Sequence, residues 1–174
     1  MCSFLVTNIP DVDLERANHF QKFRGPDHTR ITKFGDVTFV HNLLSINGAF
    51  TTQPFIDDEL ACVYNGEIYN SSDYGAFESD GLCLLPAYRA LGPRFVRELD
   101  GEFAIVIFDR SNATLFISAD VLGTKPIHYS FRGEHFGVAS YSSALEAIGF
   151  SPIIRLEPNN MPHREPIESK RNHL

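Results

Sequence analysis

The sequence predicts an α+β domain built in layers, because two strand-rich blocks alternate with helical segments. Short β-prone apolar runs gather in the first 70 residues and again between residues 102 and 139, and segments with helical spacing lie between and after them. The length of 174 residues and the hydrophobic content of 43% are enough for one domain with its own core.

The first strand is expected at residues 3–8, directly after Cys2. A helix is expected over residues 13–23, where Leu14, Ala17, Phe20 and Phe23 share one face, and it should end at Gly25-Pro26. Further strands are expected at residues 36–41, 43–46, 59–64 and 67–70. The last two flank Asn65-Gly66, and Asn-Gly between β-prone runs is a strong signal for a hairpin turn.

The second half of the chain begins with a helix over residues 80–91, which has Asp80 near its N-cap and Pro86 inside it. A short helix at 95–99 and strands at 102–108, 114–118, 127–131 and 135–139 follow, and a helix over 142–148 closes the domain. We place the boundary at residue 150. Residues 151–174 hold four of the ten prolines without periodicity, so we expect an extended tail that docks on a partner or is mobile.

Composition and charge exclude several classes of protein. The net charge of -7 and the lack of a Lys/Arg cluster argue against nucleic acid as a partner. No apolar run has the length of a membrane span, and no secretory signal is evident. The cysteines Cys2, Cys62 and Cys83 are few and widely spaced, so we expect neither disulfides nor a metal site. No cofactor is expected, and a reducing cytoplasm is the simplest compartment.

Cys2 is the first candidate for chemistry because it follows the initiator methionine, and its small side chain permits removal of Met1. A free α-amine has a pKa near about 8. It is therefore partly neutral at physiological pH and can act as the general base for the adjacent thiol. A retained Met1 would block this amine. Position alone favours a small buried residue, so the case for a nucleophile depends on other segments.

Six further segments accompany Cys2 in order along the chain. They are RGPD (24–27), HNLLSI (41–46), VYNGEIYN (63–70), ESDG (78–81), LDGEFAIVIFD (99–109) and DVLGTKPIHY (120–129). With MCSF at the start, this set resembles the glutaminase domain of the class II glutamine amidotransferases, and most of all the asparagine-synthetase branch of these N-terminal-nucleophile hydrolases. The resemblance covers residues 2–149. It implies a four-layer α/β/β/α sandwich of two antiparallel sheets.

The resemblance also implies roles for individual residues. Cys2 would be the nucleophile, and Asn65 and Gly66 would bind the oxyanion through a side-chain amide and a backbone N–H. Asp80 would hold the α-ammonium of the substrate, although a plain helix cap is compatible with its position. The remaining substrate-binding candidates are Glu67 at the pocket wall, whose direct role stays open, Leu44, Ser45 and Ile46 in the substrate loop, and Arg24 beside the nucleophile. A surface ion pair is the alternative for Arg24.

Other members of the motifs are expected to be structural. His41 is read as a buried structural histidine, and Cys62 and Cys83 as core residues. Gly123, Lys125 and Pro126 are read as a tight turn before a strand.

One position departs from the family pattern. The synthetase branch has H-x-R-L-[SA]-I in the third segment, where the Arg binds the α-carboxylate of glutamine, but Leu43 stands at that place here. The loss of a charge-assisted hydrogen bond predicts that free glutamine binds roughly ten- to hundredfold more weakly. Three explanations stay open: Arg24 or Arg30 binds the carboxylate, the substrate is an amide without this carboxylate, or a partner completes the site.

The expected function is therefore that of a glutamine amidotransferase subunit, which hydrolyses L-glutamine through a Cys2 thioester. The sequence shows neither a Ser-Gly-Gly loop nor a Gly-x-x-x-x-Gly-Lys loop for ATP phosphates, so we expect a separate ammonia-accepting synthetase, with the ATP-pyrophosphatase type as the first hypothesis. The alternatives are an amidohydrolase for a different amide and a catalytically silent regulatory subunit of the same fold.

Overall fold

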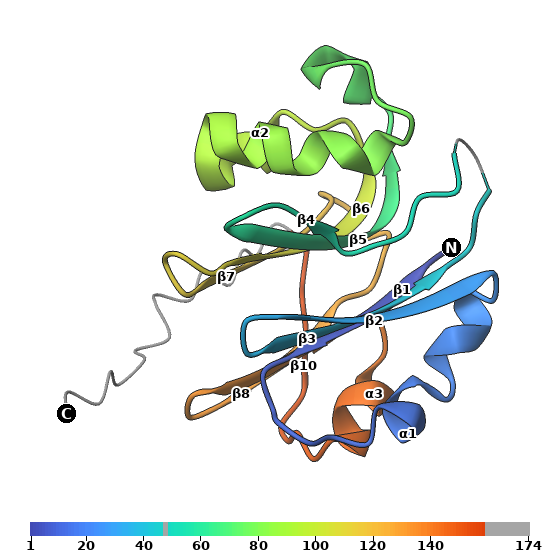
Figure 1. Ribbon diagram of the computed structural model, residues 1–174, viewed down its shortest axis with the longest axis vertical. Coiled ribbons are helices and arrows are strands. Elements are labelled where there is room, and N and C mark those ends of the chain that lie inside the picture. Colours follow the sequence, from blue (N-terminus) through green and yellow to red (C-terminus); the bar gives the residue numbers. More distant parts are fainter. Residues whose placement is uncertain (47–48, 159–174) are drawn as a thin grey trace.

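Two antiparallel sheets stack face to face, with helices on both outer sides (Figure 1). The computed structural model describes residues 1–46 and 49–158. The predicted α+β sandwich with the layer order α/β/β/α is confirmed. No helix in the described part of the chain is long and apolar enough to cross a membrane.

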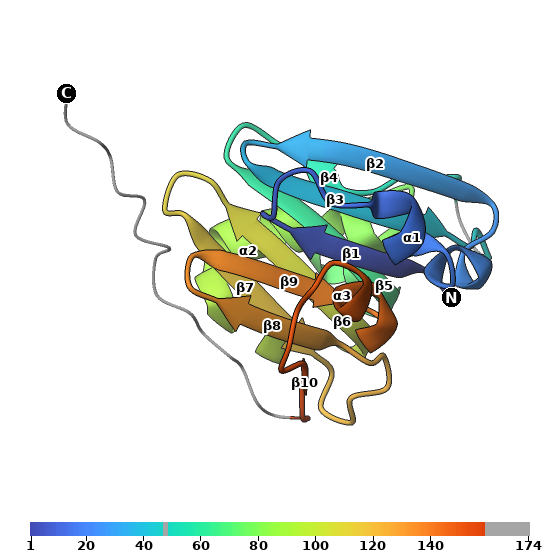
Figure 2. The same ribbon diagram turned by 90° about the horizontal axis from the view of Figure 1, so that it is seen from below.

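The larger sheet has the N-terminal strand near its centre. In sheet order, its strands are β10 (Ile154–Arg155), β8 (His128–Arg132), β9 (His135–Ala139), β1 (Ser3–Thr7), β3 (Val37–Leu43) and β2 (His28–Phe34). Figure 2 shows β1 between β3 and β9, with the N-terminus at the end of the sheet. Every residue of β1 is buried, because it is paired on both edges and covered on both faces. This pairing fixes the position of Cys2, the residue directly before it.

The smaller sheet has the order β4 (Phe55–Ile56), β5 (Leu60–Ile68), β6 (Gly101–Asp109) and β7 (Thr114–Ala119). The helix α2 (Leu84–Leu91) covers its outer face, and α1 (Leu14–Asn18) and α3 (Ser142–Ala147) cover the larger sheet (Figure 1). Four 3-10 turns complete the described elements: η1 (Gln21–Arg24), η2 (Ser71–Tyr74), η3 (Asp80–Cys83) and η4 (Gly92–Arg97).

Three apolar clusters separate these four layers. The first fills the space between the sheets and includes Phe4, Phe39 and Val106. The second packs α2 on the smaller sheet, and the third packs α1 and α3 on the larger one. Strands buried on both faces read as continuous apolar runs rather than as alternating ones, as in residues 103–108.

The predicted turn at Asn65-Gly66 is wrong. Strand β5 continues through both residues to Ile68, and each residue from Leu60 to Ile68 has a partner on β6. Gly66 adopts φ 157°, an extended conformation outside the usual range of other residues, so the backbone passes without turning. Long-range pairing with β6 outweighs the local preference of the Asn-Gly pair.

The predicted helix over residues 13–23 is shorter than expected. It breaks into α1, capped by the Asp13 side chain on the Arg16 N–H, and the 3-10 turn η1. Ala17 is buried, but Phe20 and Phe23 are 68% and 67% exposed, so the apolar face predicted for them is wrong. The predicted strand at 43–46 also fails, since β3 ends at Leu43.

The boundary expected at residue 150 does not match the packing. Strand β10 pairs with β8, and Leu156 is buried in the core between the sheets, so the domain continues at least to this residue. The part of the expected tail at residues 159–174 lies outside the described residues.

Candidate active site

A cavity of about 270 Å³ lies at the end of the sandwich where β1 begins. Its walls come from the N-terminus, the loop after β3, the end of β5, the start of η3 and the start of β6. Sites for drug-sized ligands span about 300–1,000 Å³. This cavity therefore suits a ligand of amino-acid size.

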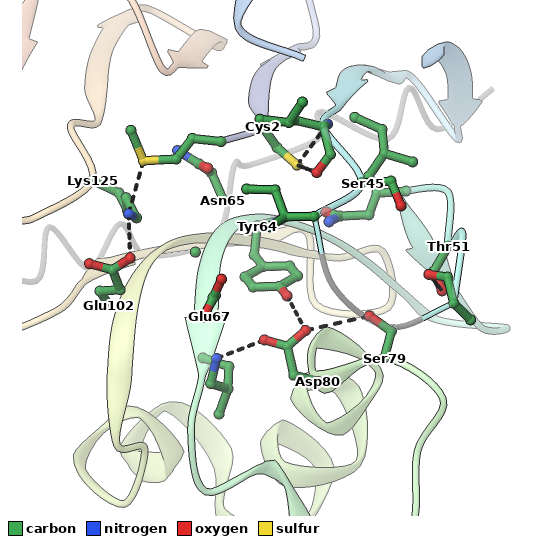
Figure 3. Close-up of a pocket in the computed structure, with 18 of the residues that line it drawn as sticks. Cys2, Ser45, Thr51, Tyr64, Asn65, Glu67, Ser79, Asp80, Glu102 and Lys125 are labelled. Carbon is green, nitrogen blue, oxygen red and sulfur yellow. Dashed lines mark hydrogen bonds and ion pairs between the residues drawn. The ribbon is translucent and has the colours of Figure 1, made fainter. Parts of the chain in front are cut away.

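The Cys2 thiol faces this cavity (Figure 3). The Leu44 N–H points at Sγ over 3.5 Å, and Sγ lies 3.8 Å from the Leu44 carbonyl oxygen. Burial raises the pKa of the Cys2 thiol, whereas the Leu44 N–H and the nearby terminal amine lower it. The thiol thus stays protonated until a base removes its proton, and a backbone donor is in place for the thiolate.

The terminal amine lies beside this thiol on Met1, which also lines the cavity. Its pKa is lowered, mainly by burial, and the charges of Arg24 and Lys125 lower it further. The Met1 thioether accepts hydrogen bonds from Lys125 Nζ at 2.9 Å and from Arg24 Nη2 at 3.4 Å. Both cations therefore surround the first residue of the chain.

A buried polar network lies behind Cys2. The Asn42 side-chain amide on β3 makes four hydrogen bonds: it exchanges two with the Asn18 amide, donates to Ser3 Oγ and accepts from Thr29 Oγ1. Ser3 Oγ in turn donates to the Gln21 carbonyl oxygen. Since an amide has two donors and two acceptor sites, Asn42 is fully satisfied. The network joins five elements of the chain behind Cys2: β1, α1, η1, β2 and β3.

Asn65 presents the opposite situation. Its side chain is 1% exposed and lines the cavity, yet neither its amide nitrogen nor its amide oxygen has a hydrogen-bond partner in the described part of the chain. A buried amide without partners costs about 1–3 kcal/mol and is rare in folded proteins. An unsatisfied donor at a cavity wall is available to a ligand.

Gly66, the next residue on β5, cannot be replaced by a larger residue without a backbone shift. A Cβ atom there would overlap the backbone oxygen of Glu102, and φ 157° is strained for other residues. The close pairing with β6 thus requires glycine and keeps the backbone beside Asn65 exposed to the cavity.

Asp80 lies at the floor of the cavity in Figure 3, held by β5. Its carboxylate accepts hydrogen bonds from Tyr64 Oη at 2.6 Å, from the Ile68 N–H at 2.7 Å and from Ser79 Oγ at 3.4 Å. Its carboxylate therefore does not cap the helix, which was the alternative reading. Burial and the carboxylate of Asp80 raise the pKa of Tyr64, so this hydroxyl remains a donor.

The substrate-loop candidates Leu44, Ser45 and Ile46 all line the cavity, as do Leu43 and Glu67. The Ser45 N–H donates to Asp27 Oδ2 at 2.8 Å, which fixes this loop. Neither Arg24 nor Arg30, the two candidate partners of a substrate carboxylate, lines the cavity. Arg24 donates to Tyr141 Oη at 3.2 Å, and Arg30 donates to Thr52 Oγ1 at 3.1 Å.

Lys125 differs from its expected role as part of a turn, because it lines the cavity. It is 4% exposed, and Nζ lies 2.6 Å from Glu102 Oε1. Glu102 and Glu67 are direct neighbours across β5 and β6, where two like charges destabilise each other, so the lysine offsets one of them. The GTKP motif alone indicated only a turn, and the loop between β7 and β8 brings Lys125 to Glu102 at the start of β6.

The sequence also missed the roles of Gln53 and Tyr64. Gln53 Oε1 accepts from the Tyr64 N–H at 2.7 Å, and Gln53 itself is buried in the cavity wall. The apolar alternation around Tyr64 could have shown that it shares a face of β5 with Cys62, but not that it reaches Asp80.

The structural assignments of the remaining motif residues agree with their burial. His41 is 1% exposed, and burial lowers its pKa to about 3, so the ring is neutral. Cys62 and Cys83 are free, buried in the second cluster, and burial raises the pKa of both thiols. Among the described residues, no group of His, Cys, Asp and Glu side chains could hold a metal ion.

Comparisons with known proteins agree with this geometry. The family model of the glutamine amidotransferase domain matches residues 1–159. The chain is 31% identical over 168 residues or more to several asparagine synthetases, including the glutamine-hydrolysing asparagine synthetase 3 of Bacillus subtilis, where the match covers 86% of this chain and 28% of that protein. This chain spans about a quarter of the length of such curated relatives.

Solved structures share the fold. The allosteric regulatory enzyme of purine biosynthesis superposes with a TM-score of 0.62 and 14% identity, over 95% of this chain and 45% of the other. The glutamine phosphoribosylpyrophosphate amidotransferase of B. subtilis superposes with a TM-score of 0.59 and 15% identity, over 95% of this chain and 49% of the other. At this identity, the likeness concerns the fold alone.

Proposed function

We propose, on the premise that this chain belongs to the family of class II glutamine amidotransferase domains, that it hydrolyses the side-chain amide of glutamine through a thioester on Cys2. The observation that carries the proposal is the unpartnered, buried amide of Asn65 in the same cavity as the Cys2 thiol. Without a ligand that hydrogen-bonds to this amide, the free-energy cost of burying it is not compensated.

Before the reaction, an aminopeptidase hydrolyses the peptide bond after Met1 and frees the α-amine of Cys2. The neutral amine takes the thiol proton, and Sγ attacks the amide carbon of the side chain. The tetrahedral intermediate collapses when the amine passes its proton to the leaving nitrogen, and ammonia departs. Water, deprotonated by the same amine, then hydrolyses the thioester to give glutamate and the free thiol. No redox partner or metal takes part in this sequence of steps.

The oxyanion of both intermediates would be bound by the Asn65 side-chain amide and the Gly66 N–H. A preorganised donor of this kind contributes about a hundred- to thousandfold in rate. Asp80 would bind the substrate α-ammonium, because its carboxylate is already oriented by Tyr64 and Ile68 and keeps an open side toward the cavity. Glu67 stands between Asp80 and Glu102 in Figure 3 and would contribute negative charge to the same wall.

The ammonia would pass to a separate synthetase. The B. subtilis relative, of which the match covers 28%, is named as a glutamine-hydrolysing asparagine synthetase. The family model that matches this chain is that of the glutamine amidotransferase domain. We infer an acceptor enzyme of the ATP-pyrophosphatase type as the partner. Capture of such an enzyme by the full chain, compared with a chain that ends at Pro158, tests whether residues 159–174 serve as the docking segment.

Covalent labelling tests the central claim. The purified protein is first checked by intact mass for the loss of Met1, and is then treated with a glutamine analogue that carries an electrophilic carbon at the side-chain carbonyl. We expect labelling at Cys2 alone, since Cys62 and Cys83 are buried with raised pKa values and serve as internal controls. The proposal is contradicted if a Cys2→Ala variant is still labelled. It is also contradicted if Met1-free protein releases no ammonia from any glutamine derivative, a result that favours a silent regulatory subunit.

A further inference from the structure

We infer that the preferred substrate is a glutamine residue whose α-carboxyl group is in amide linkage, as at the N-terminus of a peptide, rather than free glutamine. This inference rests on the proposed function and names the substrate class of the same site. The ammonia released is identical for both substrates, so transfer to a partner is unaffected.

The charge of the cavity is the first reason. Four carboxylates line it, on Glu67, Glu78, Asp80 and Glu102, and Lys125 is the single cationic side chain among its described lining residues. Lys125 is already paired with Glu102 at 2.6 Å and buried. Apart from the terminal amine, which the reaction needs in its neutral form, the lining is strongly negative. It favours an ammonium group and disfavours a second carboxylate.

The position of a free α-carboxylate is the second reason. The α-ammonium and α-carboxyl groups share one carbon atom, so they lie about 2.5 Å apart. A carboxylate on a ligand held by Asp80 must therefore lie close to Asp80. In Figure 3, Lys125 and Glu102 stand on one side of the cavity, whereas Ser45 and Thr51 stand on the other and Ser79 stands beside Asp80. The groups labelled near Asp80 on that other side are uncharged hydroxyls.

The wall formed by the loop after β3 offers no cation either. Leu43 is 7% exposed and presents an aliphatic side chain, and the Ser45 N–H is occupied by the Asp27 carboxylate. Arg30 donates to Thr52, Arg24 donates to Tyr141 and to the Met1 thioether, and neither arginine lines the cavity. A carboxylate would lose its hydration here without gaining an ionic partner, whereas a neutral amide carbonyl avoids that cost.

The outer rim suits a ligand that continues beyond the first residue. Ile46 lines the cavity and is 62% exposed, and Phe50, next to the lining residues Ala49 and Thr51, is 59% exposed. Such a rim provides apolar contact for a following peptide unit.

Two ligands separate the alternatives: L-glutamine and L-glutamine α-N-methylamide. Ammonia then reports cleavage of the side-chain amide alone, because cleavage at the α-position releases methylamine. With Met1-free protein, we expect kcat/KM for the methylamide to exceed that for glutamine by roughly ten- to hundredfold. Leu43→Arg should reverse this preference, and Leu43→Met, the matched uncharged control, should keep it.

Binding separates failure of this inference from failure of the proposed function. The Cys2→Ala variant is titrated with both ligands by calorimetry, which needs no turnover. Tighter binding of the methylamide supports the inference even if no amide is cleaved, in which case only the proposed hydrolysis fails. Equal binding, or tighter binding of glutamine, overturns the inference. The inference is also overturned if the Arg30→Gln variant no longer binds glutamine but binds the methylamide as before, because Arg30 would then be the partner of the α-carboxylate.

Discussion

Replacing Asn65 by leucine should lower activity while raising stability. Both side chains have four heavy atoms and branch at Cγ, and the amide of Asn65 has no partner in the described structure although it is 1% exposed. Removing an unsatisfied buried amide should stabilise the fold by about 1–3 kcal/mol, which corresponds to roughly 2–4 °C in Tm for each kcal/mol in a domain of this size. The loss of an oxyanion donor should lower kcat by about a hundred- to thousandfold.

The assay pairs urea unfolding with ammonia release, and Asn42→Leu is the matched control. Asn42 is also a fully buried asparagine, but its amide makes four hydrogen bonds. The same substitution there leaves several partners unsatisfied and should destabilise the fold by at least about 3 kcal/mol. If Asn65→Leu loses as much stability as Asn42→Leu, the amide has a structural partner and the argument for an oxyanion donor fails.

Three further predictions follow from the same geometry. Asp80→Asn should lower kcat/KM for a substrate with a free α-ammonium by roughly ten- to hundredfold, mainly through KM, because the charge is lost; an unchanged KM would place the ammonium elsewhere. His41 has a folded-state pKa of about 3, below its unfolded value of 6.5, so the unfolded state binds the proton first and stability falls as the pH falls from 6.5. Urea unfolding should show a loss of about 2 kcal/mol between pH 6.5 and 5, and His41→Leu should remove most of this slope; an equal slope in the variant would contradict the assignment. Gly66→Ala should cost at least about 4 kcal/mol or abolish folding, whereas Gly92→Ala, with φ 61° but open space around it, should cost about 1–2 kcal/mol, and similar losses would rule out the steric argument.

The sequence predicted the fold class and most of the long strands because buried strands leave continuous apolar runs. It missed β2 (His28–Phe34), an edge strand in which only Phe34 is buried and which carries Arg30 and Lys33. It also missed β4 and β10, which have two residues each and form through pairing with distant strands. Such elements depend on their partners rather than on local preference.

The candidate site was predicted as a set of motifs, but its contacts could not be. Cys2, Asn65 and Asp80 do line one cavity. The sequence could not show that Tyr64 orients Asp80, because that contact depends on where η3 packs on β5. It placed Lys125 in a turn, since its partner Glu102 lies 23 residues away on another strand. Both contacts depend on how η3 and the loop between β7 and β8 pack on the smaller sheet, which local patterns do not encode.

The central place of β1 has a consequence for the timing of maturation. Leu5 pairs with Ala139 on β9, so the pairing of β1, the strand that follows the proposed nucleophile Cys2, is completed only after 134 more residues have been synthesised. At a translation rate of about 5–20 residues per second, this takes roughly 7–27 seconds. During that interval Met1 is outside any folded cavity and open to an aminopeptidase. Once β9 has docked, the Met1 thioether accepts hydrogen bonds from Lys125 and Arg24, and removal of Met1 must then break these two contacts.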